Sequence, residues 1–366
     1  MGGTHRIGVV GLGAISRVYL ETLQEVDDVR IVAVADLDLG RAESIAHGIP
    51  GARASTVAGL MAAADIDAVL NLTIPTAHAE VATAAIRAGK DVYGEKPLAA
   101  DLEAARALVD DARAAGVRLG CAPDTVLGTG VQTARAVIDE GRIGRPLAAT
   151  AMMATPGHER WHPNPDFYYA PGGGPLLDMG PYYLTALVHL LGPIRRVIGA
   201  SSRLRDERRI GSGPREGERV RVDVDTHVAG VLEHESGALS TVVMSFDSVA
   251  SAAPPIEVHG ERGSLTVPDP NGFDGAPAVR LLGDAGWEPV PPLAGVADAR
   301  RGAGLIEMLR GERARPPRAS ADLGLHVLDA MTALLDSARR GAGVTLSTRA
   351  ERPPLVPLVA GIADLR

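Results

Sequence analysis

The sequence predicts an α/β protein with two domains: a doubly wound parallel sheet, followed by an α+β domain with a large, mainly antiparallel open sheet. Three observations support this prediction. The first third of the chain alternates short apolar runs with segments of helical periodicity, as βαβ units do. Longer alternating strands replace this pattern after Arg145-Pro146. The length of 366 residues suits two domains, which we place at residues 1–124 and 125–366.

The first part of the chain is expected to alternate strands and helices. Apolar runs predict strands at Arg6–Val10, Arg30–Ala35, Ala68–Leu72, Asp91–Tyr93 and Val117–Cys121. Helical periodicity predicts helices at Ile15–Gln24, Arg41–His47, Val57–Ala64, Ala77–Ala88, Leu102–Ala115 and Gly130–Glu140. Several of these helices end at a glycine, which is typical of helix C-termini.

The second domain begins with a strand at Leu147–Met153, followed by a helix that ends at Gly192-Pro193. Two hairpins are expected, and these pair Val220–Glu233 with Ala238–Phe246 and Ile256–His259 with Ser264–Val267. Helices are predicted near Leu305–Arg310 and at Leu323–Arg340, a mobile loop at 201–218, and irregular structure at 268–300. One face of such a sheet has no helix of its own to cover it. We therefore expect a homodimer or homotetramer formed through this sheet.

Composition and charge exclude several classes of protein. The formal net charge of −8 argues against a nucleic-acid backbone as the main partner. No apolar run approaches the roughly 20 residues that span a bilayer, so no membrane partner is expected. Cys121 is the single cysteine, and no apolar signal-peptide region precedes the first strand. We expect a soluble cytoplasmic protein without a metal site.

Lysine and aromatic residues have an uneven distribution. Only Lys90 and Lys96 among the 37 basic residues are lysines, and a lysine can give up a proton where an arginine cannot. Chance survival is the alternative reading. Six of the eleven aromatic side chains fall between Trp161 and Tyr183. This cluster indicates either a pocket for a flat or amphipathic ligand or structural packing alone.

A glycine-rich motif, Gly11-Leu12-Gly13-Ala14-Ile15-Ser16, lies between the first predicted strand and helix. In this context backbone N–H groups and the helix N-terminus bind the pyrophosphate of a dinucleotide. Asp36 ends the second strand, 23 residues after Gly13, where a carboxylate binds the ribose hydroxyls. Because this carboxylate repels a 2′-phosphate, NAD is favoured. Arg41, five residues after Asp36, is a cation that would suit a 2′-phosphate, so NADP stays the alternative cofactor.

Two further segments follow predicted strands, at the edge where open parallel sheets bind ligands. Thr73-Ile74-Pro75 comes after the third strand and precedes His78, which a turn and a helix surface would also explain. Gly94-Glu95-Lys96-Pro97 comes after the fourth strand. A partly desolvated lysine at this edge can exchange a proton with a reacting hydroxyl. Lys96 is therefore a candidate catalytic residue.

Asp178 and Tyr182 lie four residues apart, after Gly172-Gly173-Gly174-Pro175, and share a face if a helix has begun. Pro181 belongs in the first turn of a helix, which predicts that the helix starts no earlier than about residue 177. Both polar side chains would then lie at the mouth of the helix. Alternatively, Asp178 is only an N-cap and Tyr182 only a core residue.

Taken together, these motifs resemble the Gfo/Idh/MocA oxidoreductases, named for glucose–fructose oxidoreductase and inositol dehydrogenase. The resemblance covers almost the whole chain. It implies a Rossmann domain, a C-terminal domain used for oligomers, and hydride transfer between a nicotinamide and a sugar, glycoside or polyol. The cofactor-binding residues that it implies are Gly11, Leu12, Gly13, Ala14, Ile15, Asp36, Thr73, Pro75, His78, Glu95 and Lys96.

Members with the inositol dehydrogenase pattern carry Asp-x-x-x-His, whereas this chain has Tyr182 at the last position. The variant resembles glucose–fructose oxidoreductase and implies a phenol as acid or base, which favours a pyranose over inositol. The expected catalytic residues are Lys96, Asp178 and Tyr182. Trp161, His158 and His162 are candidates for the substrate wall, with loop packing as the alternative. Cys121–Thr125 departs from the Asn/Arg-rich segment of many members, which leaves the substrate open.

Two other functions are compatible with the resemblance. A non-catalytic dinucleotide-binding sensor is one, although keeping both Lys96 and Asp178 argues against it. An NAD-dependent glycosidase of the same fold is the other. It would turn over glycosides without net formation of NADH.

Overall fold

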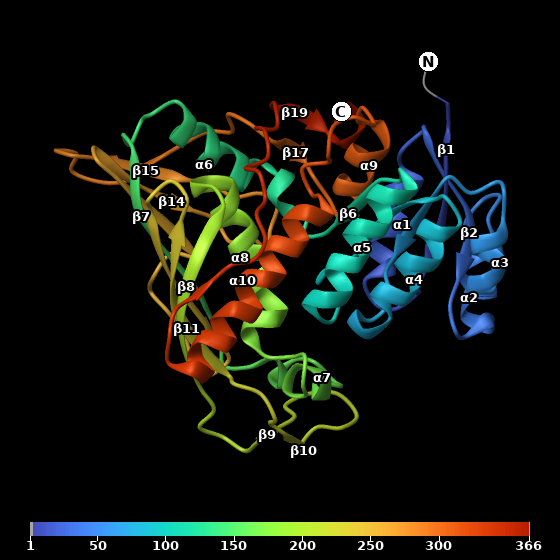
Figure 1. Cartoon of the computed structure of the whole chain (residues 1–366), viewed down its shortest axis with the longest axis horizontal. Helices are drawn as coiled ribbons and strands as arrows, with labels where there is room; N and C mark the ends of the chain where they lie inside the picture. Colours follow the sequence, from blue (N-terminus) through green and yellow to red (C-terminus); the bar gives the residue numbers. More distant parts are fainter. Residues whose placement is uncertain (1–2, 366) are drawn as a thin grey trace. The chain divides into compact units, whose positions relative to one another are not determined.

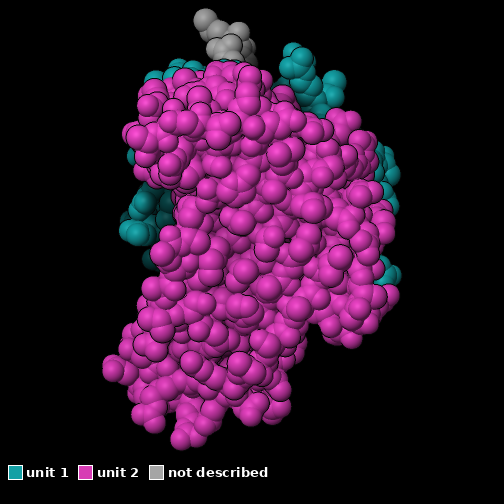
Figure 2. All heavy atoms as spheres, turned by 90° about the vertical axis from the view of Figure 1, so that its left-hand side faces the viewer, with its two compact units in different colours: residues 1–128, 296–325, 356–366 teal, residues 129–295, 326–355 magenta. Residues whose placement is uncertain are grey.

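The computed structural model describes residues 3–365, and the chain divides into two compact units (Figure 2). The first contains the described residues up to Gly128, then Val296–Leu325 and the described residues from Val356 on. The second contains Thr129–Gly295 and His326–Leu355. The predicted boundary between residues 124 and 125 lies close to Gly128, where the chain first passes from the first unit to the second. The prediction does not include the two later segments that return to the first unit.

The first unit is built on a six-stranded sheet in the order β3-β2-β1-β4-β5-β6, and every neighbouring pair is parallel. This confirms the predicted doubly wound sheet. In Figure 1, α2 and α3 lie beside β2. The strands are β1 (His5–Val10), β2 (Val29–Ala35), β3 (Arg53–Ser55), β4 (Ala68–Asn71), β5 (Asp91–Gly94) and β6 (Leu119–Cys121). The helices are α1 (Ser16–Gln24), α2 (Leu39–His47), α3 (Val57–Ala62), α4 (Pro75–Arg87), α5 (Leu102–Ala115) and the 3-10 turn η1 (Thr125–Leu127).

Ion pairs and strand pairing hold the returning segments in the first unit. The returning elements are β17 (Val296–Asp298), α9 (Ala303–Arg310), β19 (Val359–Gly361) and η3 (Ile362–Asp364). β17 pairs with β19 in parallel. At the end of α9, Arg310 donates from Nε and Nη2 to both carboxylate oxygens of Asp28, at 2.8 and 2.6 Å. These contacts join residues that are far apart in the sequence, so local pattern did not reveal them.

The second unit contains a nine-stranded sheet in the order β16-β15-β14-β13-β7-β12-β11-β8-β18. Only β12 and β7 pair in parallel, which confirms the mainly antiparallel sheet. Its strands are β7 (Pro146–Ala154), β8 (Ile194–Ser202), β11 (His227–His234), β12 (Leu239–Ser245), β13 (Ile256–Gly260), β14 (Gly263–Val267), β15 (Ala278–Leu281), β16 (Glu288–Pro289) and β18 (Val344–Thr345).

A separate two-stranded ribbon, β9 (Glu207–Arg209) with β10 (Arg219–Arg221), corrects two expectations. The segment 201–218 is not a simple loop, because it contains β9 and the end of β8. The predicted strand Val220–Glu233 is also wrong, since its first residues pair with β9 and β11 begins only at His227. Likewise, the segment 268–300 contains the short strands β15, β16 and β17.

The helices of the second unit are α6 (Thr129–Asp139), η2 (His158–Arg160), α7 (Asp166–Tyr169) and α8 (Pro175–Leu191). The long helix α10 (Ala321–Arg340) belongs to this unit from His326 on and packs against β8, where the Ser337 hydroxyl accepts from the Gly199 N–H at 2.8 Å. The predicted start of α8 near residue 177 is wrong, because Pro175 takes the first-turn position and Pro181 lies inside the helix. Among residues 3–365, no helix combines the length and apolar character needed to cross a membrane.

The β11–β12 hairpin is anchored by a buried histidine. His234 donates from Nδ1 to the Gly192 carbonyl at 2.7 Å and accepts from the Ser240 hydroxyl at 2.8 Å, which uses the neutral ring fully. Burial lowers the pKa of His234 to about 4. Burial also lowers the pKa of the nearby His326.

We predict that stability falls as the pH drops from about 6.5 to about 4. In this window the unfolded chain takes up a proton on His234 and the folded chain does not, so the unfolded state gains about 1.4 kcal/mol per pH unit from this group. Urea unfolding at several pH values measures the slope. His234→Asn keeps a donor for Gly192 and should show a shallower slope, while an equal slope in both proteins would contradict the assignment.

Candidate functional site

The glycine-rich loop after β1 has the shape that a phosphate site needs. Gly11 has φ +90°, and an added Cβ would lie 2.6 Å from the backbone of Leu72 and Thr73, so only glycine fits. An added Cβ at Gly13 would meet nothing within 4 Å, which leaves the loop open there. Ser16 is buried and its hydroxyl donates to the Gly13 carbonyl at 2.7 Å. Ser16 therefore stands at the position of the third glycine of the motif, and its hydrogen bond ties the loop to the start of α1.

Asp36, at the end of β2, organises the same loop. Its carboxylate accepts from the N–H groups of Leu12 and Asp38 at 2.8 and 3.0 Å. The Leu12 N–H is thus directed to Asp36, and Ala14 and Ile15 lie at the start of α1, where a phosphate would be expected. This loop and helix terminus fit a dinucleotide.

The charge on Asp36 is also stabilised. Partial burial alone would raise its pKa, but the two backbone hydrogen bonds and the charge of Arg41 outweigh burial and hold the pKa below its ordinary value. Arg41 reaches Asp36 at 3.6 Å and Asp38 at 3.8 Å. The Arg41 guanidinium therefore lies beside the carboxylates of Asp36 and Asp38.

The segments after β4 and β5 are tied together by His78. This buried side chain on α4 places Nδ1 2.7 Å from the Pro97 carbonyl and Nε2 3.0 Å from the Thr73 carbonyl. Asn71 accepts from the Thr73 hydroxyl at 2.6 Å and donates to the His78 carbonyl at 3.0 Å. Pro75 begins α4. His78 thus lies at the predicted edge of the sheet, where it holds two loops in place.

Glu95 positions the backbone of Lys96. The Glu95 side chain is buried, with one oxygen accepting from the Tyr19 hydroxyl at 2.8 Å and the other from the Lys96 N–H at 3.0 Å. Burial and the charge of Glu95 raise the pKa of Tyr19, which keeps the phenol a donor. Lys96 therefore follows β5 on a backbone that is fixed from α1, and the Lys96–Pro97 bond is cis.

In the second unit, two predicted residues that are far apart in the sequence come together. His158 in η2 and Asp178 in the first part of α8 form a contact of 3.1 Å between Nε2 and Oδ2. Tyr182 lies one turn further along α8 and is buried, with 5% of its surface exposed. Asp178 and Tyr182 lie one turn apart on one helix, as expected, but Tyr182 is not at the mouth of the helix because α8 begins at Pro175.

Trp161 and His162 belong to an aromatic cluster around His158. Trp161 lies 5.2 Å from the His158 ring, is 59% exposed, and contacts His162 at 5.4 Å. His162 accepts from the Asn164 N–H at 3.1 Å, and burial lowers its pKa. The predicted cluster of aromatics is thus present, and Trp161 offers the most exposed ring surface of these residues.

A buried ionic cluster next to His158 was not predicted. Arg208 on β9 contacts Glu159 at 3.1 Å and pairs with Asp247, while the Tyr169 hydroxyl donates to Glu159. Burial raises the pKa of Tyr169. Arg208 is only 5% exposed, so the ribbon is fixed onto the segment that carries His158. No sequence signal distinguished Arg208 from the neighbouring surface arginines.

Comparison with known proteins follows the same division. Residues 5–122 match an oxidoreductase family with an NAD-binding Rossmann fold, and residues 131–266 match the GFO/IDH/MocA C-terminal domain. The chain is 30% identical over 262 residues to an inositol 2-dehydrogenase of Rhizobium meliloti (strain 1021), covering 72% of this chain and 75% of that protein. It is 33% identical over 269 residues to a 1,5-anhydro-D-fructose reductase of Ensifer adhaerens, covering 71% and 75%.

The fold also matches a solved structure. The crystal structure of an NAD binding oxidoreductase from Klebsiella pneumoniae gives a TM-score of 0.81 at 22% identity, covering 94% of this chain and 99% of that one. At this identity the likeness concerns the fold alone. Together with the sequence relatives, it confirms the resemblance seen in the motifs. This chain belongs to the Gfo/Idh/MocA family of oxidoreductases and contains an NAD-binding Rossmann domain.

Proposed function

We propose that the protein catalyses reversible hydride transfer between NAD and a secondary or anomeric hydroxyl of a sugar, glycoside or polyol, with a pyranose favoured over inositol. The observation that carries this proposal is Lys96. It is one of two lysines in the chain and follows β5 in the NAD-binding unit, on a backbone held by buried Glu95. A lysine retained at this edge of the sheet suits proton exchange with a substrate hydroxyl.

The chain's own residues hold the cofactor and move the proton. Bound NAD supplies the carbon that accepts or returns the hydride. Asp36 would hold the ribose hydroxyls, and the open loop at Gly13 with the start of α1 would hold the pyrophosphate. Lys96 and Tyr182 hold the reacting oxygen and exchange its proton, while Asp178 orients the substrate.

Tyr182 supports the preference for a pyranose, and the sequence relatives support inositol as the second candidate. This chain has a phenol where the inositol dehydrogenase pattern has an imidazole. On the other side, several relatives bear the name inositol 2-dehydrogenase. The relative from Ensifer adhaerens, by contrast, bears the name of a sugar reductase.

A substrate panel tests the proposal. Absorbance of reduced nicotinamide is followed with aldoses, glycosides, 3-keto sugars and inositols, with NAD and NADP run separately. Turnover on a pyranose, lost in Lys96→Met, supports the proposal. Turnover on inositols alone would replace the pyranose by the second candidate. Turnover of glycosides without net NADH would indicate the glycosidase, and binding of NAD without any turnover would indicate the sensor.

Asp36→Ser is predicted to weaken NAD binding by about 10- to 100-fold, because it removes charged hydrogen bonds to the ribose hydroxyls. It also removes the repulsion of a 2′-phosphate, so the preference for NAD over NADP should shrink. Titration with NADH and NADPH, followed by the fluorescence of the reduced nicotinamide, measures both dissociation constants. Asp38→Ser is the matched control, since Asp38 caps α2 by accepting from the Arg41 N–H at 3.1 Å. Equal losses in the two variants would contradict the assignment.

We also propose a homodimer or homotetramer formed through the nine-stranded sheet, in the cytoplasm. The sheet face away from the helices has residues in register that are not buried, among them Ile198, Val231 and Thr241. Ile198 and Leu239 are 43% and 50% exposed, which favours a covering partner. Light scattering after size exclusion tests this proposal, and a monomer at micromolar concentration would reject it.

A further inference from the structure

His158 and Asp178 lie twenty positions apart in the sequence, and their side chains form a polar contact. His158 also belongs to the aromatic cluster with Trp161 and His162 described above. Nε2 of His158 lies 3.1 Å from Oδ2 of Asp178. The His158 side chain is 10% exposed and that of Asp178 is 20% exposed. A hydrogen bond to a carboxylate that is this well shielded from water is stronger than one at the surface.

The other ring nitrogen determines which tautomer is favoured. Nδ1 of His158 is buried and has no hydrogen-bond partner among residues 3–365. A proton on Nδ1 would leave a buried donor unsatisfied, which costs free energy, whereas a proton on Nε2 meets the Asp178 carboxylate. The geometry therefore favours the tautomer that carries its proton on Nε2.

Aromatic side chains hold the His158 ring in this orientation. Its centroid lies 4.4 Å from Phe246 and 4.7 Å from Tyr168, the latter edge to face. These rings come from different segments, so they restrain the imidazole from more than one direction. Rotation of the ring would have to displace them.

The backbone around His158 is fixed as well. Gly157 has φ +109°, a conformation that other residues rarely adopt, and the next residue after His158 is the buried Glu159. Glu159 is held by Arg208 at 3.1 Å and by the Tyr169 hydroxyl. Neither the ring nor its backbone therefore has freedom to leave Asp178 without breaking buried contacts.

From these contacts we infer that His158 is a positioning residue that fixes the Asp178 carboxylate through its Nε2–H. The inference rests on the proposed function, in which Asp178 orients the substrate. It differs from the expectation that His158 lines the substrate wall, since the imidazole acts on the substrate only through Asp178. Tyr182 occupies the position one turn after Asp178, where the inositol dehydrogenase pattern has a histidine. In this chain the imidazole that contacts the Asp178 carboxylate comes from η2.

Three substitutions at one position test the inference. In His158→Gln the amide nitrogen occupies about the place of Nε2 and donates to Asp178. His158→Asn is too short to reach, and His158→Leu has no donor. We expect kcat/KM for the sugar or polyol to fall about 10- to 100-fold in the Asn and Leu variants and to recover largely in Gln, with NAD affinity unchanged in all three. Equal activity across the three, or equal loss, would overturn the inference.

A double-variant cycle shows whether His158 acts through Asp178. In an Asp178→Ala background, His158→Leu should cause little further loss of kcat/KM, because the carboxylate that it positions is gone. A full additional loss would mean a direct role of His158 at the substrate and would overturn the inference.

A readout independent of turnover separates failure of this inference from failure of the proposed function. In ¹⁵N NMR of the wild-type protein, with His158 assigned by its absence in His158→Gln, we expect the tautomer protonated on Nε2, and a changed signal in Asp178→Ala. A protein that turns over no sugar or polyol but shows this signal would refute the proposed function and keep the His158–Asp178 geometry. The tautomer protonated on Nδ1 would overturn the inference whatever the activity.

Discussion

Lys96→Met is expected to lower kcat on the best sugar or polyol about 10²- to 10⁴-fold while the affinity for NAD stays within about twofold. Methionine has a similar length but can neither donate nor accept the proton of the reacting hydroxyl. NAD binding should survive, because methionine keeps the backbone N–H of residue 96, which donates to Glu95 and fixes this segment. Steady-state kinetics with a parallel NAD titration measures both effects.

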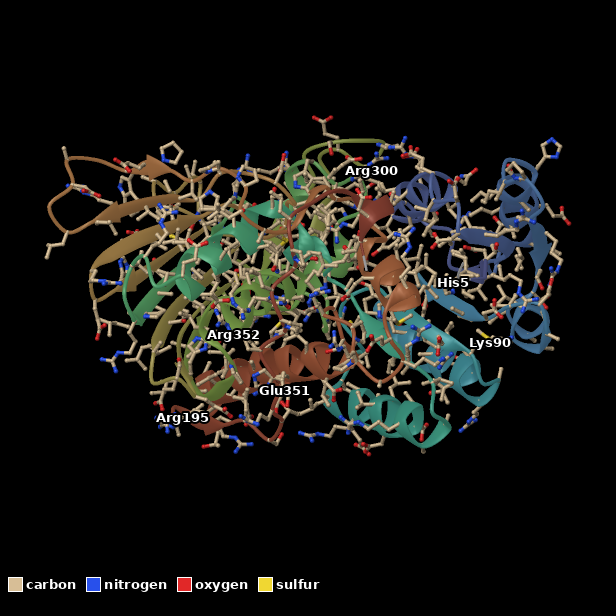
Figure 3. The ribbon with its side chains drawn as sticks, turned by 90° about the horizontal axis from the view of Figure 1, so that it is seen from above. His5, Lys90, Arg195, Arg300, Glu351 and Arg352 are labelled. Atoms are coloured by element: carbon tan, nitrogen blue, oxygen red, sulfur yellow. The ribbon has the colours of Figure 1, made fainter. Side chains whose placement is uncertain are left out.

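The other lysine is the matched control for this prediction. Lys90, labelled in Figure 3, is 5% exposed and donates from Nζ to the carbonyls of Ala63 and Ile66 at 2.7 and 2.9 Å. Burial lowers its pKa. Lys90→Met leaves two buried carbonyls without their donor, so it should reduce stability and leave kcat per folded molecule unchanged. Loss of turnover in Lys90→Met but not in Lys96→Met would reverse the assignment.

The framework of the first unit was predictable because its signals are local. Runs such as Ile7–Val10 are buried on both faces, as strands of a parallel sheet are, and each appears in the sequence as a continuous apolar segment. The strand Arg53–Ser55 was missed because it is short and only partly buried, so it has no such run. The start of α8 was missed because two prolines competed for the first turn and tertiary packing tolerates Pro181 inside the helix.

The candidate site residues of the first unit could be predicted because they follow strands. Gly11 and Asp36 come directly after strands, Lys96 comes one residue later, and the carboxyl ends of parallel strands meet at one edge of a sheet. The His158–Asp178 contact depends instead on how an irregular segment folds back onto α8. Charge pattern did not reveal the partners of Arg208 either, since Glu159 and Asp247 lie far from it in sequence and are chosen by the fold.

Arg208→Met is expected to lower the free energy of unfolding by about 3–5 kcal/mol. Arg208 donates to the Pro156 carbonyl at 3.0 Å, pairs with Glu159 and Asp247, and lies over the Tyr169 ring at 5.3 Å. Removing the guanidinium leaves the Glu159 carboxylate, which is 5% exposed, without its cation. Urea unfolding at neutral pH measures the loss.

Arg215→Met provides the comparison for Arg208→Met. Arg215 also forms two ion pairs, with Asp166 and Glu218, but both acids are more than half exposed, so the expected cost is at most about 1 kcal/mol. The double variant Arg208→Met/Glu159→Gln should recover part of the loss, because the buried charge is then removed together with its partner. If Arg208→Met costs no more than Arg215→Met, burial does not make this cluster essential. The ribbon would then be held onto the His158 segment by its apolar contacts instead.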